Sequence, residues 1–239
     1  MCEHFIARAA EPFQLRELWP FADRLERFGL AGFGWGAAWI GGDGRLRSHR
    51  DVRAFRDDHE GGMAVGQERT TAALIHLRRP SKLSTLHLPD TQPFDDPSGR
   101  YSFSHNGDLR DYRALRREYQ TQGRIHGRAD TEVGARWLED AWSPRDSPAD
   151  LLHRLHGRFG GQANLAVLTA DGVPHHYAGN GENPVFSFRL GRIGVVSTGI
   201  YSLDRSLFTF VAPGATDRHL VRQGTTAMLD ADGTATTGP

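Results

Sequence analysis

The strongest constraint on the fold is the grouping of strand-like segments into two sets with helical segments between them. Runs rich in β-branched, aromatic and small apolar residues predict strands at 72–77, 101–104, 163–169, 185–190, 193–197, 207–211 and 225–229. Apolar residues at helical spacing predict helices at about 109–121, 131–142 and 149–158. This order fits two antiparallel sheets with helices outside them better than the strict alternation of a parallel β-α-β fold.

The first part of the chain predicts a helix followed by a hairpin. Apolar residues recur at helical spacing behind Pro12, which favours an amphipathic helix near 12–28 that packs one face on a sheet. The segment 32–40 is too rich in glycine for a helix and precedes the turn sequence 41–44, so we expect a strand and then a hairpin. At the other end, the small and polar residues 232–239 predict a frayed tail.

The bulk composition narrows the classes of protein and partner. A length of 239 residues without a compositional break favours a single domain over 1–239. Lys plus Arg and Asp plus Glu both number 29, so the net charge gives no reason to expect a nucleic-acid partner. No run approaches the ~20 apolar residues of a membrane span, and the start lacks the pattern of a signal peptide. We therefore expect no membrane partner and a cytoplasmic location.

The chemistry-bearing residues give no sign of a metal or a cofactor. The only cysteine, Cys2, excludes an internal disulfide and any metal site built from several cysteines. His153 and His156 are three residues apart, and His175-His176 are adjacent, but no third ligand follows at a recognisable spacing. The glycines of 32–36 precede neither a helix nor the lysine of a phosphate-binding loop. We predict no metal and no cofactor.

Cys2 is the first candidate catalytic residue. By itself a cysteine near the end of a chain indicates little, because chain ends are often disordered. Removal of Met1 would leave Cys2 with both a thiol and an α-amine, whose pKa of about 8 allows it to take the thiol proton. The thiolate is the attacking species, so nucleophile and base would share one residue.

The sequence His105-Asn106-Gly107 is the second candidate. An Asn-Gly pair after a strand is common in turns, and that is one interpretation. The other is an oxyanion hole, in which the side-chain amide of Asn106 and the backbone N–H of Gly107 stabilise a tetrahedral intermediate. Each such donor contributes about 3 kcal/mol. Glycine suits this position because a side chain would obstruct the approach of substrate to the backbone.

Arg78 and Asp130 are the third candidate pair. Arg78 ends a strand-like run, where it could be surface charge, and Asp130 begins a predicted helix, where it could be an N-cap. Together they have the charges that an amino-acid substrate requires. A guanidinium binds an α-carboxylate through two hydrogen bonds, and a carboxylate accepts hydrogen bonds from an α-ammonium group.

Five short motifs then occur in a family's order, and together they carry a resemblance. They are Met1-Cys2, His76-Leu77-Arg78, Gln92-Pro93-Phe94, His105-Asn106-Gly107 and Asp130-Thr131-Glu132. The sequence resembles the class II glutamine amidotransferases, a group of N-terminal-nucleophile hydrolases. It is most similar to their stand-alone type, represented by the amidohydrolase of ergothioneine synthesis, and the resemblance covers nearly the whole chain.

The resemblance implies a fold and a set of roles. The fold is an α+β, four-layer αββα sandwich of two antiparallel sheets. Cys2 is implied to be the nucleophile and base, and Asn106 with Gly107 the oxyanion hole. Substrate binding falls to Arg78 for the α-carboxylate and Asp130 for the α-ammonium, while His105 and Gln92 shape the pocket. The implied reaction is hydrolysis of the γ-amide of glutamine, or of a γ-glutamyl amide, through a Cys2 thioester. We expect Trp35 to pack beneath the site.

Two departures from the family pattern leave the physiological substrate open. The loop 79–83 is stiffened by Pro80, and Ser197-Thr198-Gly199 stands where stand-alone relatives tend to carry Ser-Glu. We expect no acceptor domain within these residues, so ammonia would either pass to a separate synthase subunit or be released by plain hydrolysis. A catalytically silent regulatory or binding module stays open as an alternative, because the altered loop permits it. So does an N-terminal-cysteine amidase with a non-glutamyl substrate, which the Arg78 and Asp130 pair disfavours.

Overall fold

The computed structural model describes residues 2–29, 31–80, 83–143, 145–199 and 205–238, and these form two antiparallel sheets. The strands of the first sheet are β1 (Glu3–Gln14), β2 (Trp35–Ile40), β3 (Leu46–Asp51), β4 (Arg69–Leu77), β9 (Phe186–Leu190), β10 (Ile193–Ser197) and β11 (Ala215–Leu220). Those of the second are β5 (Phe94–Asp95), β6 (Tyr101–Gly107), β7 (Ala163–Thr169), β8 (Pro174–Gly179), β12 (Thr226–Leu229) and β13 (Ala235–Gly238). The strand orders are β11-β9-β10-β1-β4-β2-β3 and β13-β12-β8-β7-β6-β5.

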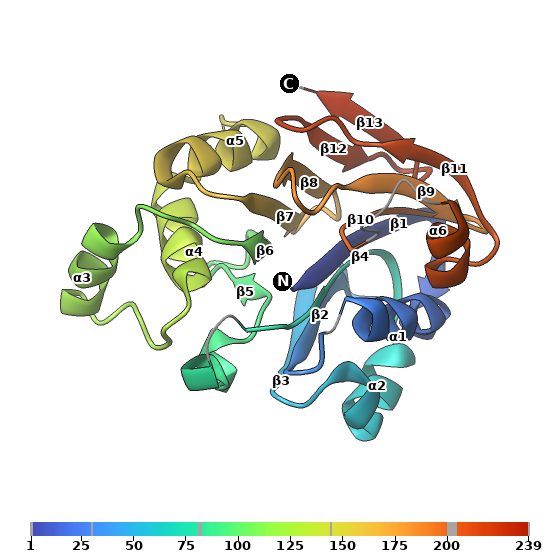
Figure 1. Ribbon diagram of the computed structural model, residues 1–239, viewed down its shortest axis with the longest axis horizontal. Coiled ribbons are helices and arrows are strands. Elements are labelled where there is room, and N and C mark those ends of the chain that lie inside the picture. The colour runs from blue at the N-terminus through green and yellow to red at the C-terminus, as the bar shows by residue number, and fades with distance from the viewer. Residues whose placement is uncertain (1, 30, 81–82, 144, 200–204, 239) are drawn as a thin grey trace.

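Helices cover the outer faces of both sheets. They are α1 (Trp19–Phe28), α2 (His59–Gly66), α3 (Arg113–Thr121), α4 (Asp130–Ala141), α5 (Pro148–Phe159) and α6 (Arg205–Val211). Figure 1 shows α1, α2 and α6 on the side of the first sheet and α3, α4 and α5 on the side of the second. Among the described residues, no helix has the length and apolarity needed to cross a membrane.

Three apolar clusters match these four layers. One lies between the first sheet and its helices, and a second lies between the other sheet and α4 and α5. The third contains inward-facing residues of both sheets, such as Ile6 and Leu74 from the first and Ala166 and Leu168 from the second. Because each sheet is apolar on both faces, neither is stable without a layer on each side. The predicted α+β sandwich of two antiparallel sheets is confirmed.

The predicted helix near 12–28 begins too early. Phe13 and Gln14 still belong to β1, where they pair with Thr70 and Arg69 of β4. A short 3-10 turn, Leu15–Leu18, follows, and α1 starts at Trp19. The apolar side chain of Phe13 is fully buried in the first core cluster, so tertiary packing outweighs the helix signal of Pro12.

The predicted strand at 207–211 is wrong, because this segment lies in α6. Phe208 and Val211 are buried, whereas Phe210 is 59% exposed. A spacing of three residues places Phe208 and Val211 on one helical face, which packs on the first sheet. The run is too short for its periodicity to distinguish a helix from a buried strand.

The predicted frayed tail at 232–239 is also wrong for the described residues. Residues 235–238 form β13 and pair with the whole of β12, as Figure 1 shows at the C-terminal end of the chain. The turn before it is closed by Asp230, whose backbone oxygen accepts from Gly233 and whose side chain accepts from Thr234 at 2.8 Å. Small polar residues therefore form an edge strand here, and Pro239 lies outside the described residues.

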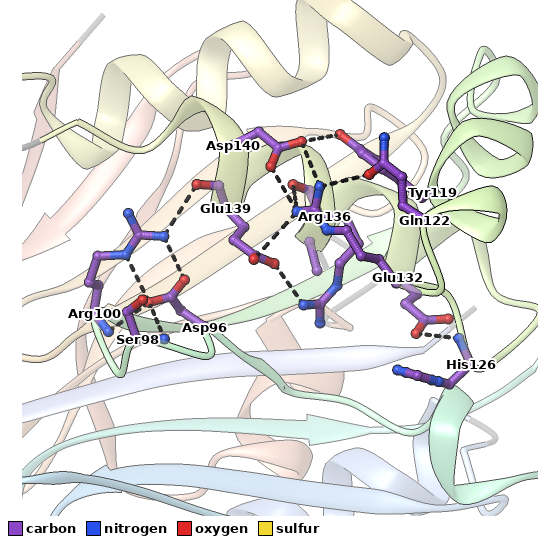
Figure 2. Close-up of polar contacts among 12 residues, drawn as sticks. Asp96, Ser98, Arg100, Tyr119, Gln122, His126, Glu132, Arg136, Glu139 and Asp140 are labelled. Carbon is purple, nitrogen blue, oxygen red and sulfur yellow. Dashed lines mark hydrogen bonds and ion pairs between the residues drawn. The ribbon is translucent and has the colours of Figure 1, made fainter.

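A polar network fixes α4, which carries part of the site. Figure 2 shows Arg136 paired with Glu139 on this helix and Asp140 bonded to the hydroxyl of Tyr119 on α3. At the start of α4, the carboxylate of Glu132 accepts the backbone N–H groups of His126 and Gly127, at 2.9 and 2.7 Å. These two bonds hold the loop that leads into Asp130.

Buried histidines lie between the sheets. His4, His76 and His176, from β1, β4 and β8, are all fully buried. The hydroxyl oxygen of Ser104 on β6 is 2.8 Å from Nδ1 of both His4 and His76, and the rings of His4 and His176 are 4.6 Å apart. Burial lowers the pKa of all three, in the case of His176 to about 3. The two sheets therefore meet around uncharged imidazoles.

Acid should destabilise the protein well before its carboxylates are protonated. The folded-state pKa of each buried histidine lies below its unfolded value of about 6.5, so the unfolded chain binds protons first as the pH falls. We expect the free energy of unfolding to drop below about pH 6.5 by as much as about 1.4 kcal/mol per pH unit for each such histidine. Urea denaturation measured between about pH 7.5 and about pH 5 checks this.

A matched pair of variants isolates the effect. His176→Gln should reduce the dependence of the unfolding free energy on pH by the contribution of about one histidine. The same change at the exposed His59 should not reduce it. Stability that does not change over this pH range would contradict the assignment of neutral buried imidazoles.

Candidate active site

The site forms where β1 begins, between the ends of β4 and β6. Glu3 and His4 pair with Leu77 and His76 of β4, so Cys2 lies beside the residues that follow β4. Figure 1 shows this end of β1 at the centre of the molecule. A cavity of about 540 Å³ opens there, lined by Cys2, Arg78, Arg79, Pro80, Thr85, Asp90, Gln92, His105, Gly107, Asp108, Tyr112, Arg128, Ala129, Asp130 and Thr131.

The sequence-predicted residues therefore come together from distant parts of the chain. Of the seven, six line this one cavity, and Asn106 is the exception. Trp35, which we expected beneath the site, is fully buried in the first core cluster, and its indole N–H donates to Asp58 at 3.0 Å.

Cys2 is held by the backbone of the next strand end. Its Sγ accepts the N–H of Arg79 at 3.2 Å and lies 3.4 Å from the carbonyl oxygen of the same residue. Burial raises the pKa of the thiol, although the Arg79 N–H and the charge of Arg78 act in the opposite direction. The thiol is therefore protonated at neutral pH, and a nucleophilic attack by Cys2 needs a base.

Asn106 contacts the backbone of Cys2 and is not among the residues that line the cavity. Its Nδ2 donates to the carbonyl oxygen of Cys2 and to Oγ1 of Thr198, the latter at 3.2 Å. Within the part of the chain that the structure describes, Oδ1 of Asn106 has no hydrogen-bond partner. Both amide hydrogens are thus engaged by Cys2 and Thr198 in this arrangement.

Gly107 lines the cavity in a conformation that favours glycine. Its φ is +133°, and an added Cβ would lie 1.7 Å from the carbonyl oxygen of Gln162. The β6–β7 pairing therefore requires a residue without a side chain at this position. Gly107 is also one of the residues that line the cavity.

Arg78 is a buried cation with spare hydrogen-bonding capacity. The residue is 3% exposed, and one Nη donates to the carbonyl oxygen of Thr85. The other, Nη1, has no partner among the described residues. Burial lowers the pKa of this guanidinium but leaves it charged. The charge of Asp90 acts on this guanidinium, but Nη1 still lacks an acceptor, which the carboxylate of a ligand can supply.

Three carboxylates line the same cavity, those of Asp90, Asp108 and Asp130. Asp130 accepts the backbone N–H of Leu109 at 2.7 Å and is partly buried at the first turn of α4. Asp90, which the sequence analysis did not single out, is 1% exposed and accepts the N–H groups of Arg128 and Ala129 through Oδ1. Its Oδ2 has no hydrogen-bond partner in the described segments. The only sequence signal for Asp90 is its place two residues before Gln92.

Gln92 and His105 hold the cavity wall. The side-chain amide of Gln92 donates to the carbonyl oxygen of His105 at 3.0 Å and accepts its N–H at 2.6 Å. The ring of His105 in turn lies 3.0 Å from the hydroxyl of Thr131, through Nδ1. Burial lowers the pKa of His105, so its imidazole is neutral at pH 7. These contacts fix the end of β6 against the start of α4.

Comparison with known proteins bears on the fold of the chain. The model of the glutamine amidotransferase domain family matches residues 81–168, which include Asp90, Gln92, Asn106 and Asp130. The glutamine phosphoribosylpyrophosphate amidotransferase of B. subtilis superposes with a TM-score of 0.73 at 19% identity, over 99% of this chain and 49% of that one. The chain has the class II glutamine amidotransferase fold.

Two shorter solved structures share the amidotransferase fold along nearly their whole length. A glutamine aminotransferase class-II domain protein from Silicibacter pomeroyi is 17% identical with a TM-score of 0.64, over 98% of both chains. A glutamine amidotransferase identified by prediction in Pseudomonas aeruginosa is 14% identical with a TM-score of 0.54, over 98% of this chain and 99% of that one. The chain spans about half the length of the first two solved structures that it matches, and no curated protein matches it.

Among the described residues, one group of side chains has the spacing of a metal site, and it lies outside the cavity at Cys2. Ligand atoms of His49, Asp51 and Asp58 fall within 4.8 Å of one another. However, the guanidinium of Arg53 pairs with both carboxylates, at 2.8 and 2.5 Å, and Asp58 also accepts from Trp35. The guanidinium already occupies an oxygen of each carboxylate and offsets part of their charge, so this group carries no metal proposal.

Gly107→Ala should be strongly destabilising. The added methyl group would overlap the Gln162 carbonyl oxygen at a φ of +133° that alanine rarely adopts. We expect a loss of about 3 kcal/mol or more in the free energy of unfolding, from backbone strain and overpacking together. The control is Gly157→Ala in α5, where an added Cβ meets nothing within 4 Å and should raise helix stability by up to about 1 kcal/mol. Equal stability of the two variants would contradict this account.

Proposed function

We propose that the protein hydrolyses the γ-amide of glutamine, or of a γ-glutamyl amide, through a thioester on Cys2. One observation carries this proposal. A thiol and a buried guanidinium with an unpaired Nη1 line the same cavity, at Cys2 and Arg78. A nucleophile beside a fixed cation suits a substrate that bears a carboxylate at one end and an amide at the other.

The reaction begins with the base. Because burial raises the pKa of the Cys2 thiol, the proton must be taken up by a nearby group when sulfur attacks. The α-amine of Cys2 serves as that group once Met1 has been removed, since its pKa of about 8 leaves it partly unprotonated at neutral pH. While a residue precedes Cys2, its nitrogen is a peptide amide and cannot act as a base.

The remaining steps follow from the positions of the donors. Sγ of Cys2 forms a bond to the amide carbon, and the carbonyl oxygen becomes an oxyanion near Gly107. Asn106 contributes a second donor when one N–H leaves the Cys2 carbonyl oxygen and turns to the oxyanion. The α-ammonium returns the proton to the leaving nitrogen, and ammonia or an amine departs. Water then cleaves the thioester to give glutamate and the free thiol.

Substrate selection falls to the charged groups of the cavity. Arg78 binds the α-carboxylate, and Asp130 accepts the α-ammonium group. Asp90 supplies a second carboxylate with an unpaired Oδ2 beside the same space. The cavity of about 540 Å³ lies within the size range of sites for ligands larger than one amino acid. A γ-glutamyl amide with a substituent on nitrogen therefore fits as well as glutamine.

The fate of the ammonia is a second part of the proposal. The similar phosphoribosylpyrophosphate amidotransferase is named for glutamine and an acceptor, and this chain matches 49% of it. We propose that ammonia passes to a synthase subunit or is released by hydrolysis. Glutaminase activity that rises only with a co-purifying synthase favours transfer, and full activity of the isolated chain favours hydrolysis.

One observation favours a second candidate, a catalytically silent binding module on the same fold. The amide of Asn106 bonds to the Cys2 carbonyl oxygen and to Thr198 instead of lining the cavity. A chain fixed in this arrangement would bind glutamine through Arg78 and the acidic residues without turnover. Binding of glutamine without ammonia release would establish this alternative.

Arg78 should discriminate substrates by their carboxylate. We expect Arg78→Gln to lower kcat/KM for glutamine by about 10-fold to 100-fold, because a hydrogen bond between charged groups contributes about 1.5–3 kcal/mol. For 4-aminobutanamide, which lacks the α-carboxylate, the same substitution should have little effect. Ammonia release measured for both proteins with both substrates checks this.

The comparison also separates the proposal from a non-glutamyl amidase. Wild-type turnover of 4-aminobutanamide or of a penicillin equal to that of glutamine would contradict the role of Arg78. Cys2→Ala is the blank for the assay and should release no ammonia.

A further inference from the structure

A fully buried carboxylate lies directly beside the nucleophile. Glu3 follows Cys2 and is completely inaccessible to solvent. Its Oε2 accepts a hydrogen bond from Oγ1 of Thr198 at 2.8 Å and from Nδ2 of Asn183 at 3.3 Å. Burying a carboxylate costs several kcal/mol unless donors satisfy it. Its position beside the catalytic cysteine therefore calls for a functional explanation.

The space around Glu3 leaves it no freedom to move. A Cβ added at Gly29 or at Gly199 would lie 2.5 Å from an atom of the Glu3 side chain. Asn183 is itself fixed, because its Oδ1 accepts the N–H of Gly199 at 2.9 Å and its backbone oxygen accepts from Asn164 at 2.8 Å. The carboxylate thus stands at one defined position relative to Thr198.

Glu3 determines where the hydroxyl hydrogen of Thr198 points. A hydroxyl has one hydrogen, and a carboxylate only accepts. The Thr198 hydroxyl is 2.8 Å from the Glu3 carboxylate and 3.2 Å from the carbonyl oxygen of His4, so the closer and charged acceptor takes the hydrogen. The lone pairs of Oγ1 are then free to accept, and they receive the N–H of His4 at 3.0 Å.

The same lone pairs fix the side-chain amide of Asn106. Nδ2 of Asn106 lies 3.2 Å from Oγ1 of Thr198 and also contacts the Cys2 carbonyl oxygen. If the Thr198 hydrogen pointed at Asn106 instead, the amide would turn its oxygen toward Thr198 and Cys2. An oxygen there would repel both the Cys2 carbonyl and a developing oxyanion.

We propose that Glu3 is a positioning residue, which acts through Thr198 to hold the amide of Asn106 with its N–H groups toward Cys2. The inference rests on the proposed function, because it concerns the group that would stabilise the oxyanion there. It assigns a purpose to a buried charge that neither binds substrate nor takes part in proton transfer.

The first test reads the orientation of Asn106 without any substrate. In the wild-type protein the side-chain N–H signals of Asn106, identified by their loss in Asn106→Ala, should exchange slowly with solvent. Glu3→Met keeps a long side chain but removes the acceptor, and Thr198→Val removes the hydroxyl. Both variants should lose this protection. Protection equal to that of the wild type in both variants would overturn the inference, whatever the substrate.

The second test reads catalysis per active site. For glutamine hydrolysis we expect Glu3→Met and Thr198→Val each to lower kcat by about 10-fold to 100-fold with little change in KM, because a misoriented donor no longer stabilises the oxyanion. The double variant should be no slower than either single one, since both changes break one chain of bonds. The amide oxygen of Glu3→Gln still accepts a hydrogen bond, so the kcat of this variant should lie between those of the wild type and Glu3→Met.

Two controls separate positioning from a structural role. Alkylation of Cys2 by iodoacetamide forms no oxyanion. The alkylation rate constant on the high-pH plateau should therefore be the same in the wild type and Glu3→Met. Thr226→Val makes the same substitution at a buried strand position whose hydroxyl has no partner in the described chain, and it should leave kcat unchanged.

The outcomes distinguish the two proposals. If kcat and the alkylation rate fall together in Glu3→Met, the residue only supports the local structure and the inference is overturned. A wild-type protein that shows protected Asn106 amide protons but releases no ammonia would contradict the proposed function while supporting the positioning chain.

Discussion

The antiparallel pairing of β1 with β4 is the interaction on which the site depends. Register places Glu3 and His4 opposite Leu77 and His76, so Cys2 meets Arg78 and Arg79 as β4 ends. A slip of one residue would turn Phe5 and Ala7 from the helix-side cluster to the face between the sheets, where Ile6 packs, and would move the thiol away from the Arg79 backbone. Packing of alternate β1 side chains into two different clusters therefore fixes the position of Cys2. The chemistry at the start of the chain is a consequence of packing along the whole strand.

The buried histidines between the sheets and the buried arginine at the cavity differ in charge. Between the sheets, His4, His76 and His176 are neutral because burial lowers their pKa. At the cavity, Arg78 keeps its charge although burial disfavours it, and it has an unpaired donor. A hydrogen-bond partner for Nη1 of Arg78 within the folded protein would make that protein more stable. A guanidinium that lacks this partner therefore fits a role in binding a ligand.

Sequence patterns predicted the layers and the gathering of most site residues. Motif residues such as Arg78, Gln92 and Asp130 lie in one cavity although more than fifty positions separate the first from the last. The errors arose where local signals are weak. The segment that forms α6 is too short for its period to decide, and β13 lacks the apolar pattern of a strand because it pairs at a sheet edge.

Other features depend on contacts that no local pattern encodes. The hydrogen bonds of Asn106 to Cys2 and Thr198 join residues from three separate strand ends. The unpaired oxygen of Asp90 results from a loop that bonds only the other oxygen. Spacing along the chain could not give the direction of either side chain, because that direction is set by partners about 40 to 100 positions away.

The central claim is that Cys2 is an N-terminal nucleophile, and intact mass spectrometry tests it most directly. The protein is measured before and after treatment with a diazoketone analogue of glutamine. The account predicts a mass that lacks Met1 before treatment and the added mass of one covalently bound inhibitor after it. The added mass should be absent in Cys2→Ala. A chain that retains Met1 and takes up no inhibitor would contradict it.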